Sequence, residues 1–176
     1  MSSDATLGAD FTWSALTRTK EPPPGGVRVL HVEPDEEFAK LVRGYLTSKG
    51  WDVRWLNDGR KALATWDDYA PDLLITELQG SDLDGFEFIL EIANFEAPPG
   101  IVVCTDLVGA GSWTRESLDA LGVYAALVRP LRFPELGATL DEALELTRAR
   151  RAAQAAGWAD KNPSAPAYGR SEPESW

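Results

Sequence analysis

The chain has little sulfur and few basic residues. Its 176 residues include one cysteine, one histidine and 17 lysines and arginines against 28 aspartates and glutamates, so the formal net charge is −11. A single cysteine excludes an internal disulfide and a cysteine-rich metal site. Cys104 lies in an apolar run, where we expect a buried, unreactive thiol. The acidity argues against nucleic acid as a partner, because binding to nucleic acid needs a basic surface.

Long apolar runs are also missing. No stretch approaches the ~20 residues of a transmembrane helix, so we expect no membrane span. The first residues lack the charged and apolar regions of a secretory signal, so we expect the protein in the cytoplasm. The composition is 44% hydrophobic and 10% aromatic, which is typical of a globular domain with a sizeable core.

The two ends of the chain differ from its middle. Residues 1–26 are polar and finish in a run of three prolines and two glycines, which predicts a flexible tail and a Pro/Gly linker. This tail carries the apolar cluster Phe11-Thr12-Trp13-Ser14-Ala15-Leu16. The cluster is either part of an unstructured tail or a short docking peptide in which Trp13 contacts a partner. Residues 157–176 have the composition of a disordered tail.

Residues 27–156 form the predicted domain. Short apolar runs alternate there five times with amphipathic segments, and most runs are apolar without alternation, as in parallel strands covered on both faces. Gly157 is expected to end the last helix. This order predicts an α/β fold with a doubly wound, five-stranded parallel sheet in a single domain. The predicted strands are 27–32, 51–56, 72–76, 100–104 and 125–128, and the predicted helices are 36–48, 59–69, 86–95, 113–121 and 134–156.

Such sheets place their sites at the carboxyl ends of the strands. Glu33, Glu77, Thr105 and Arg129 follow four of the predicted strands, so we expect these residues to converge. His31 lies inside the first strand without a metal-ligating neighbour, and we expect a structural histidine with satisfied hydrogen bonds.

From about Val27 to Leu146 the chain resembles the receiver domains of response regulators. The resemblance is carried by five blocks in order: Val29-Leu30-His31-Val32-Glu33-Pro34-Asp35, Pro71-Asp72-Leu73-Leu74-Ile75-Thr76-Glu77, Asp82-Leu83-Asp84-Gly85, Ile101-Val102-Val103-Cys104-Thr105 and Ala125-Ala126-Leu127-Val128-Arg129-Pro130. It implies the flavodoxin-like fold and a signalling role in a two-component system. In that family the acid at the position of Glu77 is an aspartate that accepts a phosphoryl group from a histidine kinase.

The metal-binding positions of this family are only partly kept. Glu33 matches the first acidic position and Gln79 matches the residue whose backbone carbonyl binds the metal. Pro34 stands where an acidic side chain would bind magnesium, and proline offers no side-chain oxygen. Asp35 is expected to face elsewhere, and Glu77 is one methylene too long. Because Mg²⁺ requires a tight octahedron of oxygen ligands, we expect its binding to be weak or absent, and we expect no other cofactor.

The switch positions depart as well. Thr105 matches the family's switch hydroxyl, but Arg129 replaces a lysine and Ala126 replaces the aromatic residue that moves with the threonine. Arginine is permanently charged and can hold a carboxylate through two hydrogen bonds. We therefore predict an ion pair between Glu77 and Arg129, of the exposed kind that contributes little stability.

Taken together, these departures predict a pseudo-receiver. It would be a signalling adaptor without enzymatic activity that binds other signalling proteins, a kinase or a chemosensory component among them. Family analogy places the contacts, or a homodimer, on residues 113–121, 125–128 and 134–156, with Trp113 and Ala126 as candidate contact residues. Two alternatives stay open: a phosphoacceptor in a phosphorelay, and a pocket in which Arg129 and Thr105 bind a small anion or nucleotide.

Overall fold

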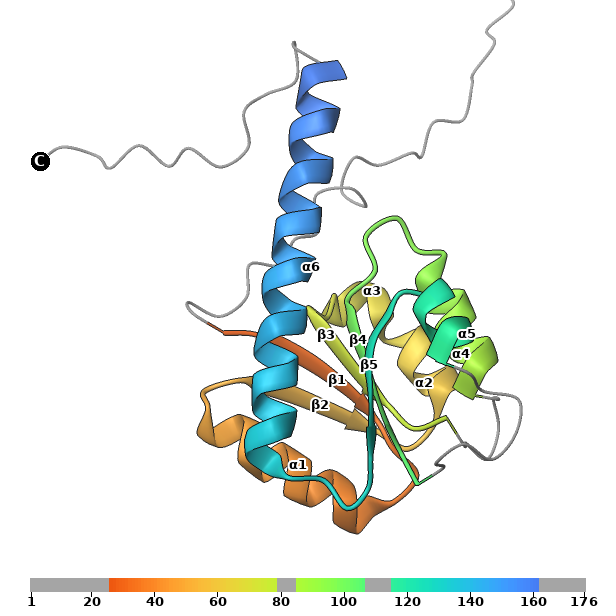
Figure 1. Ribbon diagram of the computed structural model, residues 1–176, viewed down its shortest axis with the longest axis vertical. Coiled ribbons are helices and arrows are strands. Elements are labelled where there is room, and N and C mark those ends of the chain that lie inside the picture. The colour runs from red at the N-terminus through yellow and green to blue at the C-terminus, as the bar shows by residue number, and fades with distance from the viewer. Residues whose placement is uncertain (1–25, 79–84, 107–114, 162–176) are drawn as a thin grey trace, which may run out of the picture.

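The computed structural model describes residues 26–78, 85–106 and 115–161, with five parallel strands that form one sheet in the order β2-β1-β3-β4-β5 (Figure 1). This order is that of the flavodoxin-like sheet, which confirms the predicted fold. The strands are β1 (Arg28–Val32), β2 (Asp52–Leu56), β3 (Leu73–Thr76), β4 (Gly100–Thr105) and β5 (Val123–Val128). The helices are α1 (Glu36–Ser48), α2 (Gly59–Ala64), α3 (Trp66–Tyr69), α4 (Gly85–Ala93), α5 (Arg115–Ala120) and α6 (Phe133–Lys161).

Helices cover both faces of the sheet, with α1 and α6 on one side and α2 to α5 on the other (Figure 1). Two separate apolar clusters lie between these layers. Val29 of β1 belongs to the cluster beneath α1 and α6, whereas its neighbour Leu30 belongs to the cluster beneath α2 and α4. This division follows from the strand geometry, in which successive side chains point to opposite faces.

Helix α1 shows how the sequence sets the local structure. The Asp35 carboxylate accepts hydrogen bonds from the backbone N–H groups of Glu37 and Phe38 and so caps the helix. Gly50 follows the helix with a φ of 80°, a conformation that glycine adopts without strain. Asp35 is thus committed to the helix cap and, as expected, does not face the strand-end site.

The predicted helix 59–69 is wrong in its continuity. α2 ends at Ala64 and α3 begins at Trp66, with Thr65 between them at φ −100° and ψ 0°. The Thr65 hydroxyl donates to the Ala62 carbonyl at 3.1 Å. Such side-chain bonds compete with the helical pattern, which explains the break.

Strand β5 does not have the two-sided cover expected for parallel strands. Ala126 and Val128 are exposed, whereas β3 and β4 are buried along their whole length. The cause is position, because β5 pairs with β4 on one side and forms an edge of the sheet.

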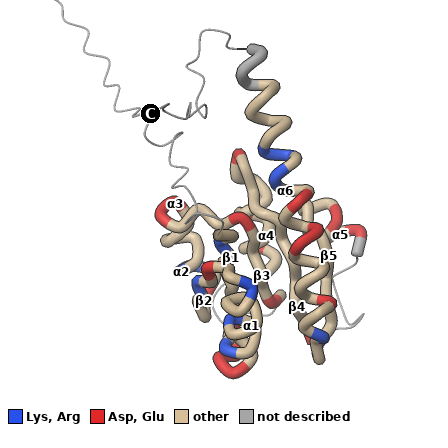
Figure 2. Tube along the Cα trace, turned by 90° about the vertical axis from the view of Figure 1, so that its left-hand side faces the viewer, with Lys and Arg blue, Asp and Glu red and all other residues tan. Residues whose placement is uncertain are grey.

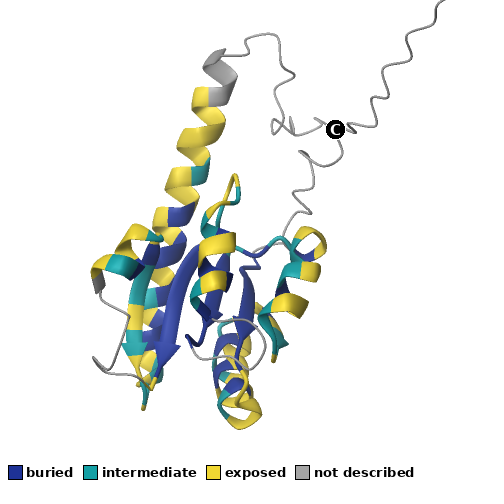
Figure 3. Ribbon diagram, turned by 90° about the vertical axis from the view of Figure 1, so that its right-hand side faces the viewer, coloured by how far each residue is buried: buried dark blue, intermediate teal, exposed yellow. Residues whose placement is uncertain are grey.

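The predicted end of the last helix is also wrong. α6 passes through Gly157 and continues to Lys161, so the first residues of the predicted C-terminal tail are helical. Residues 152–157 are all exposed and extend beyond the sheet (Figures 1 and 3). A glycine inside a helix costs only ~1 kcal/mol relative to alanine, and the alanines on either side of Gly157 favour a helix. Among the described residues, no helix is both long enough and apolar enough to cross a membrane.

Candidate functional site

The carboxyl ends of four neighbouring strands bring the predicted site residues together. Glu33 follows β1, Glu77 follows β3, Thr105 ends β4 and Arg129 follows β5. Backbone hydrogen bonds extend the sheet to this level: the Glu77 N–H donates to the Val32 carbonyl at 3.2 Å, and the Arg129 N–H donates to the Thr105 carbonyl at 2.9 Å. The sheet itself therefore fixes where these four side chains begin.

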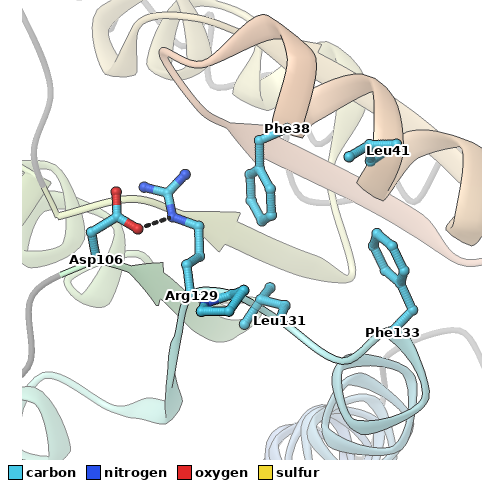
Figure 4. Close-up of a pocket in the computed structure, with 7 residues that line it drawn as sticks. Phe38, Leu41, Asp106, Arg129, Leu131 and Phe133 are labelled. Carbon is cyan, nitrogen blue, oxygen red and sulfur yellow. Dashed lines mark ion pairs between the residues drawn. The ribbon is translucent and has the colours of Figure 1, made fainter.

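Arg129 lies among three carboxylates. Its Nη2 donates to Glu77 Oε2, and its Nη1 lies 3.4 Å from Glu33 Oε2. Its Nε lies 3.0 Å from Asp106 Oδ1 (Figure 4). The geometry of this third contact is not that of a hydrogen bond, so we regard it as electrostatic. The predicted pair of Glu77 and Arg129 is present, and we call Glu33, Glu77 and Arg129 the ion cluster.

The ion cluster is buried, contrary to the expected exposed pair. The side chains of Glu33, Glu77 and Arg129 are 1%, 5% and 14% exposed. One cause is Phe38 of α1, whose ring centroid lies 4.7 Å from Arg129 Cζ. In this setting the removal of one partner leaves an uncompensated buried charge, which costs far more than the loss of a surface pair.

Each carboxylate of the cluster is held on both of its oxygens. Glu33 Oε1 accepts from the Asp35 N–H at 2.9 Å, and Glu77 Oε1 accepts from the Leu78 N–H at 2.6 Å. Burial raises the pKa of Glu33, and the Asp35 N–H and the charge of Arg129 oppose this effect. Burial would lower the pKa of Arg129, but the charges of the surrounding carboxylates outweigh it and raise that pKa. Arg129 therefore remains a permanent cation.

The carboxylate oxygens of the ion cluster are poorly suited to bind the magnesium ion that the receiver resemblance implies. Mg²⁺ needs several free oxygen ligands, but the carboxylate oxygens of Glu33 and Glu77 are already engaged by N–H groups and by Arg129. Pro34 contributes no side-chain oxygen, and Gln79 lies outside the described residues. Within those residues, no group of three or more acidic, histidine or cysteine side chains is placed to hold a metal.

His31 and Cys104 are buried next to the ion cluster. Both are fully buried, and Cys104 is a free thiol whose pKa is raised to about 12 by burial. His31 packs edge-on against Phe38 at 6.2 Å, but neither ring nitrogen has a hydrogen-bond partner in the described part of the chain. The hydrogen-bond partners expected for His31 are therefore not found among these residues. Burial and the charge of Arg129 lower the pKa of His31 to about 3.

A groove opens beside Arg129, between the start of α1 and the segment that leads from β5 into α6. Its volume is about 450 Å³, and the rings of Phe38 and Phe133 face each other across it (Figure 4). We call it the α1–α6 groove; it is lined by Phe38, Leu41, Asp106, Arg129, Pro130, Leu131 and Phe133. The sequence did not predict this groove, because its walls come from segments about 90 residues apart.

Three other predicted residues are not part of the ion cluster. Pro34 is exposed after β1, Thr105 is buried and Ala126 is exposed on β5. Trp13 and Trp113 lie outside the described residues. Sequence reasoning missed Asp106, although an acidic residue directly after a strand-end threonine is a usable signal.

Comparisons with known proteins agree on one family. The profile described as the response regulator receiver domain matches residues 29–141. The transcriptional regulatory protein ZraR of Klebsiella oxytoca is 30% identical over 124 residues, which cover 69% of this chain and 27% of ZraR. The transcriptional regulatory protein TrcR of Mycobacterium tuberculosis is 35% identical over 66 residues, covering 38% of this chain and 26% of TrcR. The chain thus spans about a quarter of the length of these regulators.

Solved structures show the same fold. The signal receiver domain of the putative Luxo repressor protein from Vibrio parahaemolyticus superposes with a TM-score of 0.65 at 23% identity, over 72% of this chain and 96% of that domain. A two-component response regulator from Clostridium difficile gives a TM-score of 0.62 at 23% identity, over 68% and 96% of the two chains. The profile covers more than half of the chain, and the chain therefore belongs to the response regulator receiver domain family of two-component signalling.

Proposed function

We propose that this receiver domain signals without being phosphorylated. In this proposal it is a pseudo-receiver that acts as an adaptor through protein–protein contacts in the cytoplasm, with no catalysis of its own. The observation that carries the proposal is the ion cluster: the guanidinium of Arg129 binds both Glu77, at the acceptor position, and Glu33, at a metal-ligand position.

Phosphoryl transfer to Glu77 would require this cluster to be taken apart. The carboxylate would have to attack phosphorus while a divalent cation neutralised the phosphoryl oxygens. Glu77 Oε2 is bound to Arg129, and a guanidinium cannot leave as a neutral group at physiological pH. Separating a buried pair of this kind costs roughly 3–5 kcal/mol, in addition to the barrier of the reaction.

We propose other signalling proteins as the partners, including kinases or chemosensory components. The exposed side chains of Ala126 and Val128 on β5 support a contact surface or homodimer that involves α5, β5 and α6. The net charge of −11 makes nucleic acid an unfavourable ligand. An affinity capture with the full chain, compared with a chain lacking residues 1–21, would identify a partner.

Incubation with acetyl phosphate and magnesium, followed by intact-mass spectrometry, tests the proposal. We expect no added phosphate on the native chain. The matched control is the triple variant Pro34→Asp, Glu77→Asp and Arg129→Lys, which restores the family's residues in the same fold and should gain one phosphate. A stable phosphate on the native chain would contradict the proposal and favour the phosphorelay alternative.

Magnesium binding is tested separately by titration with NMR detection. We propose that the native chain shows no saturable shift at residues 33, 77 and 106, whereas the triple variant does. Saturable binding of magnesium to the native chain at physiological concentrations would contradict this expectation, because the metal would then have displaced Arg129 from the carboxylates.

A further inference from the structure

The α1–α6 groove exposes apolar surface that a stable domain would normally cover. Five of its lining residues are apolar, and Leu41 is 60% exposed. Its volume of about 450 Å³ falls in the range of ~300–1,000 Å³ typical of ligand pockets. Exposed apolar hollows of this kind are characteristic of interaction sites.

The chain carries a segment whose side chains match this surface. Phe11, Trp13 and Leu16 lie within six residues of an otherwise polar stretch. They are followed by the basic residues Arg18 and Lys20. A large apolar group with a basic flank is the pattern of a docking segment that buries aromatic anchors and pairs its charges at the rim.

Length permits this segment to reach the groove of its own chain. Ten residues lie between Leu16 and Val27, and because an extended or polyproline-like chain covers roughly 3.1–3.3 Å per residue, the steps from Leu16 to Val27 span roughly 34 Å. The groove lies at the far end of β1, a five-residue strand that spans roughly 17 Å. The Pro/Gly linker is therefore long enough to run back along α1.

Charge favours the same placement. The first turn of α1 carries Glu36 and Glu37, whose side chains are 60% and 87% exposed. They precede Phe38, which lines the groove. Lys40 pairs with both carboxylates, at 3.1 Å and 3.4 Å, and leaves one of the two negative charges uncompensated. A segment docked through its apolar residues would bring Arg18 and Lys20 near this exposed negative charge.

We propose that residues 11–20 dock in the α1–α6 groove of their own chain, with Phe11, Trp13 and Leu16 in the apolar hollow and Arg18 and Lys20 beside Glu36 and Glu37. This goes beyond the proposed function and does not depend on it. Because Phe38 contacts both the groove and Arg129, occupancy of the groove bears directly on the ion cluster.

Paramagnetic relaxation tests the proposal in the full chain. Cys104 is buried with a raised pKa, so a nitroxide reagent should modify only a newly introduced cysteine. A label on Ser14→Cys should selectively broaden the amide signals of residues 36–41 and 131–133. A label on Ser164→Cys, in the other terminal segment, is the matched control and should leave them sharp.

Two variants sharpen the result. Leu41→Glu changes an exposed residue of the groove and should abolish the broadening, whereas Leu90→Glu changes a residue 43% exposed on α4 and should not. Mixing spin-labelled chain with isotope-labelled chain distinguishes docking in a second copy, which would contradict the intramolecular proposal. Absent or uniform broadening with Ser14→Cys would also overturn it, whatever the phosphorylation assay shows.

Discussion

At the scale of single residues, Arg129 supplies the internal cation of the site. Without Arg129, the buried carboxylates of Glu33 and Glu77 would lack a compensating positive charge, which should destabilise the fold. We expect Arg129→Ala to lower the free energy of unfolding by about 3–5 kcal/mol at neutral pH, measured by urea denaturation. The control Glu37→Gln, at an 87% exposed side chain, should change it by less than ~0.5 kcal/mol.

The pH dependence of this variant has a definite sign. A carboxyl group whose pKa is raised in the folded state contributes stability below its ordinary pKa and loses it as pH rises through the folded value. Burial already raises the pKa of Glu33 in the native chain, and Arg129 opposes that shift. The deficit of Arg129→Ala should therefore shrink on acidification, and a deficit that grows instead would contradict the assigned role of Arg129.

His31 is a buried polar group without hydrogen bonds in the described residues. Such a group costs about 1–3 kcal/mol, so His31→Val should raise the free energy of unfolding by about that amount. The folded pKa of about 3 lies below the ordinary 6.5, so the native chain loses stability as pH falls from 6.5 toward 3. Below pH 6.5 this loss is about 1.4 kcal/mol per unit. Denaturation curves at pH 7 and 5 should show this term in the native chain and not in His31→Val.

At the scale of elements, Gly85 joins β3 to α4. Its N–H donates to the Leu78 carbonyl at 3.1 Å, and a Cβ at this position would lie 2.6 Å from the Leu78 backbone carbon atoms. Backbone atoms cannot yield as a side chain can, so Gly85→Ala should destabilise the domain by about 1–3 kcal/mol or more. Gly44→Ala is the matched control, because nothing lies within 4 Å there and the gain in helix propensity should stabilise by ~0.5–1 kcal/mol. Thermal unfolding of both variants decides the point.

Helix α6 is fastened to the sheet through Arg151. Its guanidinium contacts Asp72 Oδ1 at 3.1 Å and the carbonyls of Pro71 and Ala97 at 3.1 and 3.3 Å. We expect Arg151→Ala to speed hydrogen exchange at residues 148–157 and to cost about 1–3 kcal/mol. Arg148→Ala, at an exposed position on the same helix, should leave both unchanged, and equal effects of the two variants would count against this role.

The sequence predicted the elements well where one signal dominated. The apolar runs around Leu74 and Val102 identified buried strands, and the first helix was predicted with the bounds 36–48 that the structure has. The predictions were wrong where two local signals competed: the hydroxyl of Thr65 bonds to Ala62 and divides a helix, and the surrounding alanines outweigh Gly157 so that α6 continues past it. The sequence also predicted that Glu33, Glu77, Thr105 and Arg129 lie together at the carboxyl ends of the strands, because the end of a strand can be recognised from the local sequence.

The burial of the ion cluster was not accessible from the sequence. The burial depends on Phe38 of α1, whose ring covers the guanidinium of Arg129. The two residues are far apart in the sequence, so no local sequence pattern predicts this contact. The missing hydrogen bonds of His31 have the same origin, because they depend on which side chains surround the ring.

At the scale of the whole molecule, we expect the exposed end of α6 to contribute little to the stability of the domain. Residues 152–157 are exposed, and the basic residues Arg148, Arg150 and Arg151 lie where α6 leaves the sheet (Figure 2). We expect a chain that ends after Ala152 to keep its thermal midpoint within ~1 °C. A chain that ends after Leu146 should melt lower, because it also loses buried Thr147 and the Arg151 contacts. Scanning calorimetry measures both.

The ion cluster also constrains which substitutions this sequence can accept during evolution. Restoring an aspartate at position 77 alone would shorten the arm that reaches Arg129, and restoring a smaller cation at position 129 alone would loosen the hold on Glu33 and Glu77. Each single step toward a working acceptor leaves a buried charge poorly matched, at a cost of several kcal/mol. We therefore expect the departures from the family pattern to be inherited together, as one unit that single substitutions do not readily undo.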